Sequence, residues 1–186
     1  MGFHTFDAEK AEKLEDASER YRYLSREELL YAIDPSSEDV IADLGSGTGF
    51  FTDDVAPYVE TVYAVDVQEA MHDIYREKDL PENVEPVTSD IESLPFETDE
   101  LDGAFSTMTY HEFATEAAIE ELTRVLREGA TLVIADWSAE GEGIGGSTPE
   151  ERYAASDAVE ALEAAGFEIV HTATRLETFL IIGVSR

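Results

Sequence analysis

The stretch VIADLGSGTGFF, residues 40–51, decides the fold, because a short apolar run passes directly into three closely spaced glycines. Residues 40–44 predict a buried strand, and Gly45, Gly47 and Gly49 predict a tight turn into a helix. Backbone N–H groups in such a turn can approach a ligand without obstruction by Cβ atoms. The spacing G-x-G-x-G is one residue shorter than the dinucleotide fingerprint G-x-G-x-x-G. The stretch therefore predicts a nucleoside-type site, with an ordinary strand-to-helix turn as the alternative.

Beyond this stretch, short β-branched runs alternate with helical segments. The runs lie at 61–66, 84–88, 101–107 and 130–136, and the helices lie near 48–58, 68–78 and 115–127. Such alternation predicts a parallel sheet with helices on both faces. Two final runs, 167–173 and 178–184, are too close for a helical crossover, so they predict an antiparallel hairpin. Pro86 predicts that the third run lies at a sheet edge, because proline cannot serve a central ladder.

The N-terminal part of the chain has a different pattern. We expect residues 1–38 to form a helical extension or lid, and residues 39–186 to form one ligand-binding domain, because 186 residues suit a single core. Ser25 and Glu28 predict a capping box for a helix. At the start of the chain, an aromatic group could close over the site, although such a terminus is more often frayed; it comprises Phe3, His4 and Phe6.

The composition is strongly acidic. Lys and Arg number 12 against 43 Asp and Glu, which gives a formal net charge of -31, while 43% hydrophobic residues supply a core. The acids are spread along the chain rather than gathered in runs, which favours adaptation to multimolar intracellular salt, as in a halophilic archaeon, over an ordinary solvated surface. Nucleic acid and anionic membranes are therefore not expected as partners, because both repel this surface at low salt.

The absence of cysteine excludes disulfides, thiolate metal sites and a cysteine nucleophile. The N-terminal residues lack a basic region followed by an apolar run, and no stretch approaches the ~18 apolar residues of a membrane span. A cytoplasmic location is therefore expected.

Acidic residues follow two more strands of the predicted sheet. Asp66, followed by Val67, ends the run TVYAVD and is placed to accept the hydroxyls of a ribose. Asp90, followed by Ile91, comes after the next strand and can bond an adenine amino group while the isoleucine packs on the ring. The alternatives are a helix cap for Asp66 and a loop aspartate that bonds its own backbone for Asp90.

Together these motifs resemble the class I S-adenosylmethionine-dependent methyltransferases, of the small kind similar to the ubiquinone and menaquinone biosynthesis methylases. The resemblance runs from Val40 to the C-terminus. It implies a Rossmann-like α/β fold: a doubly wound, mostly parallel seven-stranded sheet with an antiparallel C-terminal strand and helices on both faces. It also implies S-adenosylmethionine as cofactor and S-adenosylhomocysteine as product.

The resemblance assigns roles to individual residues. It implies that the methionine part of the cofactor lies against Asp43, Gly45, Ser46, Gly47 and Gly49. It further implies that Asp66 with Val67 holds the ribose and that Asp90 with Ile91 holds the adenine, while the floor beneath the sulfonium comprises Ser106, Thr107 and Met108. The regions 1–30 and 138–155 match no acceptor-specific pattern, so the donor is better defined than the acceptor.

Methyl transfer from a sulfonium is an in-line displacement, so a general base is needed only when the acceptor must lose a proton. Tyr110, His111 and Glu112 follow the fourth strand and are the candidate catalytic residues. His111 is preferred because it titrates near neutrality; the alternative is a helix-start histidine bonded to backbone. Asp136 and Trp137, at the end of the fifth strand, could form part of an acceptor wall; the alternative for Trp137 is a packing residue with its N–H satisfied.

The histidines carry no metal-ligand spacing, and we expect no metal; they are His4, His72, His111 and His171. The expected acceptor is a small molecule of unidentified chemistry, and no oligomeric state is predicted. Two alternatives remain at this point: an NAD-dependent oxidoreductase, which should have the longer glycine spacing, and a non-catalytic cofactor-binding protein of the same fold.

Overall fold

The computed structural model describes residues 8–186, and its regular elements follow the predicted alternation. The strands are β1 (Val40–Leu44), β2 (Thr61–Asp66), β3 (Val84–Thr88), β4 (Leu101–Thr107), β5 (Leu126–Trp137), β6 (Glu168–Thr174) and β7 (Thr178–Val184). The α-helices are α1 (Ala17–Tyr23), α2 (Arg26–Ile33), α3 (Phe50–Val55), α4 (Glu69–Arg76), α5 (Tyr110–Phe113), α6 (Glu116–Val125) and α7 (Ala155–Ala164). Short 3-10 helices are η1 (Ala8–Glu15), η2 (Ala56–Tyr58), η3 (Ile91–Ser93) and η4 (Pro149–Glu151).

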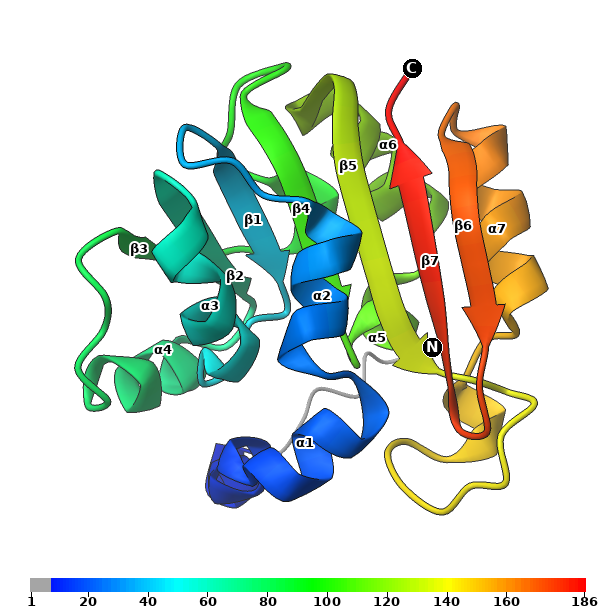
Figure 1. Cartoon of the computed structure of the whole chain (residues 1–186), viewed down its shortest axis with the longest axis horizontal. Helices are drawn as coiled ribbons and strands as arrows, with labels where there is room; N and C mark the ends of the chain where they lie inside the picture. Colours follow the sequence, from blue (N-terminus) through cyan, green and yellow to red (C-terminus); the bar gives the residue numbers. More distant parts are fainter. Residues whose placement is uncertain (1–7) are drawn as a thin grey trace.

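The strands form one sheet in the order β3-β2-β1-β4-β5-β7-β6 (Figure 1). Neighbours from β3 to β5 pair in parallel, and β7 is antiparallel to both β5 and β6. The predicted Rossmann-like sheet with an antiparallel C-terminal strand is therefore confirmed, and so is the terminal hairpin. Pro86 lies in β3, at the sheet edge as predicted, where a residue without an N–H is tolerated.

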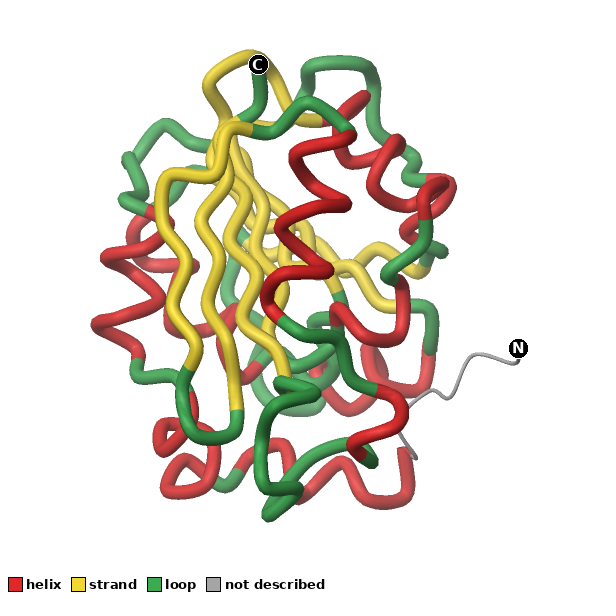
Figure 2. Tube along the Cα trace, turned by 90° about the vertical axis from the view of Figure 1, so that its right-hand side faces the viewer, coloured by secondary structure: helices red, strands yellow, loops and turns green. Residues whose placement is uncertain are grey.

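Helices cover both faces of the sheet (Figure 2). Alternation along each strand divides the apolar residues between two cores: Ile41 of β1 packs with α2, α3 and α4, whereas Ala42 and Leu44 pack with α5, α6 and α7. The same alternation sends Asp43 toward the α2 and α3 face. On β5, Ile134 packs on the α5 side, so Asp136, two residues later, faces α5.

Some boundaries differ from the sequence predictions. β5 begins at Leu126 rather than 130, because Leu126 already pairs with Leu101 before a register shift, and α6 therefore ends at Val125. The predicted capping box at Ser25 is only half formed. The Ser25 hydroxyl accepts the Glu28 N–H at 3.2 Å, but the Glu28 carboxylate instead accepts from Arg175.

The N-terminal helices lie at the carboxyl ends of the parallel strands. Figure 1 shows η1 and α1 beyond the ends of β1 and β5, while α2 runs along the front of the sheet. This edge also holds the glycine turn after β1. Within the described part of the chain, no helix is long and apolar enough to cross a membrane.

Candidate functional site

The glycine turn after β1 adopts a backbone conformation that favours glycine. Gly45, Gly47 and Gly49 have φ angles of 80°, 54° and 81°, all in the left-handed region. The N–H groups of Gly45 and Ser46 both donate to the Val65 carbonyl at 2.9 Å, which ties the turn to the end of β2. These hydrogen bonds hold the turn in place between the ends of β1 and β2.

Two of the three glycines are required for packing within the chain. A Cβ on Gly45 would lie 2.3 Å from the Thr109 side chain, and one on Gly49 would lie 2.1 Å from the Tyr75 ring. A Cβ on Gly47 would meet only the flexible end of Leu14, at 3.3 Å. Close approach of a ligand therefore explains Gly47 better than it explains the other two, whereas the sequence offered the same reason for all three.

Asp66 at the end of β2 braces the turn. Its Oδ2 accepts the Gly47 N–H at 2.9 Å, and its Oδ1 accepts the Gln68 N–H at 2.8 Å. The helix-capping alternative is wrong, because Gln68 is the N-cap of α4 and Asp66 accepts no N–H from within that helix. Each carboxylate oxygen has a second lone-pair direction, so Asp66 can still accept hydrogen bonds from hydroxyl groups. Its neighbour Val67 is half exposed, at 52%.

Asp43 is buried without a full set of partners. Its Oδ2 accepts the Thr52 hydroxyl at 2.6 Å, but its Oδ1 has no hydrogen-bond partner. Burial raises the pKa of Asp43 to about 7, against the opposing effects of Thr52 and Arg20. The Ser46 hydroxyl, on the turn itself, is also buried and unpartnered. Buried polar atoms are nearly always satisfied in native proteins, so these atoms fit a polar ligand at the turn.

Arg20 of α1 was not found from the sequence, because no motif surrounds it. Its guanidinium lies over the Phe51 ring at 4.8 Å and over the Phe50 ring at 5.7 Å, and its Nε is buried without a partner. Burial lowers the pKa of Arg20 to about 10, against the charges of Asp43 and Glu15. A helix of the N-terminal extension thus carries a cation to the face where Asp43 lies.

η1 fastens the same extension to the turn. The Glu15 carboxylate accepts from the Thr48 hydroxyl and, at 2.8 Å, from Lys78 Nζ. Lys78 Nζ also donates to the Thr48 carbonyl at 2.9 Å. The N-terminal helices therefore lie directly on the glycine turn. Phe3, His4 and Phe6, predicted as part of a lid, lie outside the described residues.

The residues predicted for adenine lie after β3. Asp90 Oδ1 accepts the Glu92 N–H at 3.0 Å and caps η3, as the loop alternative describes, and Ile91 is buried in the core on the α5 side. The carboxylate of Asp90 remains exposed and able to accept more bonds. An adenine role for both residues stays a prediction.

The end of β4 combines a buried hydroxyl with backbone strain. Ser106 Oγ is buried and unpartnered, and the Thr107 side chain is buried as well. Met108 has φ 61°, a conformation that a residue with a side chain rarely adopts. Such strain often accompanies functional sites. These residues lie between the ends of β1 and β5, and their role as the floor of the site stays a prediction.

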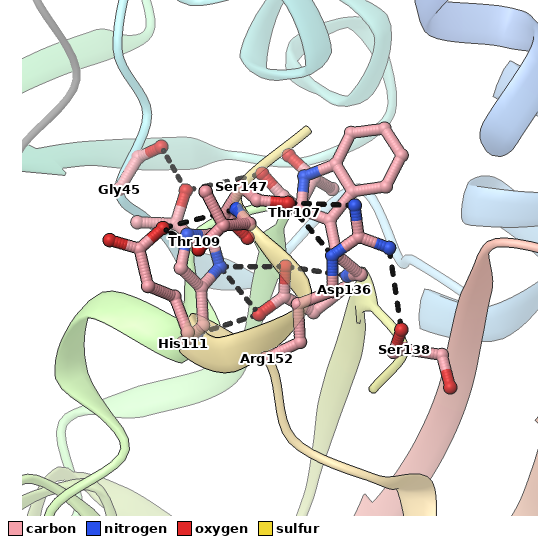
Figure 3. A network of polar contacts seen from close by, with 11 residues as sticks. Gly45, Thr107, Thr109, His111, Asp136, Ser138, Ser147 and Arg152 are labelled. Atoms are coloured by element: carbon pink, nitrogen blue, oxygen red, sulfur yellow. Dashed lines mark hydrogen bonds and ion pairs between the residues drawn. The ribbon is translucent and has the colours of Figure 1, made fainter. Parts of the chain in front are cut away.

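Asp136 at the end of β5 holds His111 of α5 in one orientation (Figure 3). His111 Nδ1 lies 3.0 Å from both Asp136 oxygens. The His111 backbone N–H donates to Oδ2 at 2.6 Å, and the Trp137 N–H donates to Oδ1 at 2.8 Å. Burial lowers the pKa of His111, but the hydrogen bond and charge of Asp136 outweigh it, so the pKa lies above its ordinary value. The carboxylate occupies Nδ1, which leaves Nε2 as the basic nitrogen.

The two other catalytic candidates are placed differently. Burial raises the pKa of Glu112 to about 7, while the adjacent His111 opposes the shift. Tyr110 is fully buried between Phe113 and Phe179 in the core, and burial raises the pKa of its hydroxyl. The structure therefore brings His111 and Glu112 together at the sheet edge but places the Tyr110 ring in the core.

A clamped loop covers Trp137, the predicted acceptor wall. Arg152 donates to the Ser147 carbonyl at 2.7 and 2.9 Å and to the Ser138 carbonyl at 3.4 Å (Figure 3). It also donates to the Gly145 carbonyl and forms a buried ion pair with Glu177 at 3.3 Å. The Arg152 guanidinium also lies 5.5 Å from the Trp137 ring centroid.

Opposite this loop, the Tyr23 ring packs on Trp137 edge to face, with 4.6 Å between centroids. The tryptophan is only 8% exposed. It thus joins α1 to the end of β5. Among the described residues, no group of three or more histidine or acidic side chains is arranged to hold a metal ion.

Comparison with known proteins identifies relatives of this site. The family described as methyltransferase domain matches residues 42–134, which contain the glycine turn, Asp66 and His111. A biotin biosynthesis bifunctional protein of Cellvibrio japonicus is 36% identical over 95 residues, which cover 50% of this chain and 19% of that protein. A methyltransferase-like protein of Schizosaccharomyces pombe is 35% identical over 103 residues, covering 55% and 39%. The chain thus spans a minor part of these two relatives.

Solved structures match over nearly the whole chain. A SAM-dependent methyltransferase from Aquifex aeolicus has a TM-score of 0.86 and 31% identity, covering 98% of this chain and 100% of that one. A methyltransferase in complex with the Haloferax volcanii Trm112 methyltransferase activator has a TM-score of 0.82, covering 98% and 99%. At 18% identity, the second likeness concerns the fold alone.

Proposed function

We propose a donor site and a catalytic base for this chain, which belongs to the methyltransferase domain family and is an S-adenosylmethionine-dependent methyltransferase. The proposal is that it methylates a small molecule whose acceptor atom must lose a proton, with His111 as the base. The observation that carries the proposal is the bonding of both Asp136 oxygens to His111 and its backbone. A histidine held in this way presents Nε2 in its basic form.

The donor is proposed to lie on the glycine turn. The unpartnered atoms Asp43 Oδ1 and Ser46 Oγ support this assignment for the methionine part, and the free lone pairs of Asp66 support it for the ribose. Asp90 and Val67, both exposed at neighbouring strand ends, are proposed to contact the adenine side. Each of these residues follows or ends a parallel strand, where ligands of open α/β sheets bind.

When bound, S-adenosylmethionine supplies a methyl group on a positively charged sulfur, which is an activated leaving group. The residues of this chain then have two tasks. They must align the acceptor atom with the methyl carbon, and they must keep water out. Trp137, the Tyr23 ring and the loop clamped by Arg152 are proposed to serve both, because together they bury an aromatic wall beside His111.

His111 Nε2 is proposed to take the acceptor proton. The resulting imidazolium is stabilised by the buried Asp136 carboxylate, whose four contacts to His111 and Trp137 leave it little freedom to move. Glu112, with a pKa raised to about 7 by burial, is proposed to pass that proton to solvent. We leave Tyr110 out of the base, because its ring is enclosed in the core.

A small acceptor is proposed because the chain repels polyanions. A formal net charge of -31 opposes binding of nucleic acid unless salt screens it. The same charge supports the proposal that the protein works in concentrated salt inside a cell, and that its acceptor is neutral or cationic.

The experiment supplies S-adenosylmethionine with a labelled methyl group and compares phenols, amines and carboxylic acids as acceptors, over a range of pH. The proposal expects label on phenols or amines, with an activity that rises with pH through the His111 titration. In His111→Gln this rise of activity with pH should disappear. Activity should return only at the higher pH at which the acceptor loses its proton without a base. Label found only on carboxylates, which need no base at neutral pH, would contradict the proposed role of His111.

A further inference from the structure

Arg20 lacks the ion pair that most of the described cations of this acidic chain form. Most described Arg and Lys side chains have an acidic partner within ion-pair distance; examples are Arg76 with Glu69, Arg124 with Glu121 and Arg152 with Glu177. Among the side chains that the structure describes, Arg20 forms no ion pair and its Nε has no hydrogen-bond partner, although acids outnumber bases in the sequence by 43 to 12. A half-buried cation whose Nε is buried without a partner among so many acids points to a charge that arrives from outside the chain.

The surroundings of Arg20 limit what that charge can be. The guanidinium lies over the Phe50 and Phe51 rings, and Asp43 and Glu15 are the acids that raise its pKa. The Oδ1 atom of Asp43 also lacks a hydrogen-bond partner. A half-buried cation and a buried anion, each with a buried unsatisfied atom, therefore lie near enough for the charge of Asp43 to raise the pKa of Arg20. They complement a ligand group that carries both a negative and a positive charge.

We infer that Arg20 binds the carboxylate of the amino-acid end of the methyl donor, while Asp43 binds its ammonium. The inference rests on the proposed donor site. A planar guanidinium suits a carboxylate, because its donors can bind both oxygens at once. Asp43 receives at Oδ1 the donor that it lacks. The N-terminal extension thereby becomes part of the donor site, and the fold without α1 would bind the nucleoside end only.

The competing explanation makes Arg20 a structural counter-charge for Asp43 alone. A pair serving only the fold would be expected to form a direct hydrogen bond, because an unsatisfied buried charge is destabilising. Here the Arg20 Nε and the Asp43 Oδ1 are both left without a partner. The two explanations differ in one measurable respect: only a ligand-binding Arg20 distinguishes donors that have the carboxylate from donors that lack it.

The test compares the binding of S-adenosylhomocysteine and of decarboxylated S-adenosylhomocysteine, which keeps the ammonium but not the carboxylate, by calorimetry on the full chain. Arg20→Gln should weaken S-adenosylhomocysteine by roughly 10- to 100-fold and the decarboxylated ligand by less than about threefold. The affinity of Arg20→Lys for S-adenosylhomocysteine should lie between those of wild type and Arg20→Gln, because an ammonium keeps the charge but cannot bind both carboxylate oxygens as a guanidinium does. Arg22→Gln, on the same helix but exposed against the Tyr23 ring, is the matched control and should leave both affinities unchanged.

The outcomes separate this inference from the proposed function. If the wild-type chain binds neither ligand, the proposed donor site itself is wrong. If Arg20→Gln weakens both ligands equally, or neither, Arg20 does not bind the carboxylate and the inference is overturned. Melting curves establish that each variant is folded, and if Arg20→Gln does not fold, the ratio of the two affinities in Arg20→Lys decides in the same way.

Discussion

Two buried aspartates at the same edge of the sheet have opposite hydrogen bonding. Asp43, at the end of β1, faces α2 and α3 and has an oxygen without a partner, beside an equally unsatisfied Arg20. Asp136, at the end of β5, faces α5 and has both oxygens bonded to His111 and Trp137. The first region is incomplete in the protein alone, whereas the second is fully assembled.

This difference indicates that the region of Asp43 gains hydrogen bonds when a ligand binds, whereas the region of Asp136 is already rigid. Unsatisfied buried atoms around the glycine turn gain hydrogen bonds when a ligand arrives, so this donor region, comprising Arg20, Asp43 and residues 45–49, should tighten on binding. In the acceptor edge, comprising His111, Asp136 and Trp137, no side-chain atom is both buried and without a hydrogen-bond partner. Preorganised groups of this kind need no rearrangement at the moment of reaction.

The largest expected effect concerns the acceptor edge. Asp136→Asn replaces an acceptor of two backbone N–H groups by an amide that can accept at only one end, so His111 loses its orientation and its counter-charge. We expect kcat to fall about a thousandfold, within the range of general-base removal, with donor affinity unchanged. Steady-state kinetics and calorimetry measure the two quantities.

His111→Gln should lower kcat by a similar factor, and the double variant should fall no further, because the two residues act as one unit. Asp102→Asn is the matched control. The Asp102 carboxylate accepts the Val40 N–H at 2.6 Å near the starts of β4 and β1, at the other end of the strands from His111. Additive losses in the double variant would show that His111 and Asp136 act separately.

Titration of His111 should also appear in stability. Its pKa is raised in the folded protein, so the His111–Asp136 pair stabilises the fold fully below the ordinary histidine pKa of about 6.5. That contribution is lost as the pH rises through the folded pKa. The difference in unfolding free energy between wild type and His111→Gln, measured in urea, should therefore be larger at pH ~5 than at pH ~9. A difference independent of pH would contradict the charged pair.

An intermediate effect, on the melting temperature, is expected for Arg152, which fastens the loop beside Trp137. Arg152→Met removes every donor to the carbonyls of Ser138, Gly145 and Ser147 and leaves Glu177 without its cation. We expect the melting temperature to fall by roughly 5–10 °C. Arg186→Met, at the exposed pair with Glu168, is the control and should change it by less than about 1 °C. An unaltered melting temperature in Arg152→Met would mean that the loop is not fastened by this arginine.

Asp66→Ala tests the donor region. We expect S-adenosylhomocysteine to bind about 1.5–3 kcal/mol more weakly, the range for lost hydrogen bonds to a charged group. Because Asp66 also accepts the Gly47 N–H, Asp66→Asn serves as the milder comparison that preserves an acceptor for the turn. Affinity that is equal in wild type and both variants would place the ribose elsewhere.

The smallest expected effect is a gain. The pKa of Asp43 is raised by burial to about 7, so stability is greatest below the unfolded value near 3.8 and is lost as the pH rises toward 7. Asp43→Asn should therefore raise the unfolding free energy by about 1 kcal/mol at pH ~8, and less at pH ~5, while weakening donor binding. Urea titrations at both pH values test this, and a variant less stable than wild type at pH ~8 would contradict it.

The sequence predicted the fold more completely than the site. Strand alternation and turn glycines are local signals, and they were sufficient for the sheet, its antiparallel strand and the edge position of Pro86. The link between His111 and Asp136 joins residues from two elements and has no local signature, although both residues were chosen for their positions after strands. Arg20 could not be found, because its significance lies in what it fails to contact.

The contrast between the two regions is tested most directly by amide hydrogen exchange, with and without S-adenosylhomocysteine. The amides of His111 and Trp137, both bonded to Asp136, should exchange slowly already in the free protein and change little on binding. The amides of α1, the helix that carries Arg20, should become markedly slower when the ligand is added, whereas those of Gly45, Ser46, Gly47 and Gly49 are already bonded within the chain. Fast exchange at His111 and Trp137 that slows only with ligand would contradict a preassembled acceptor edge.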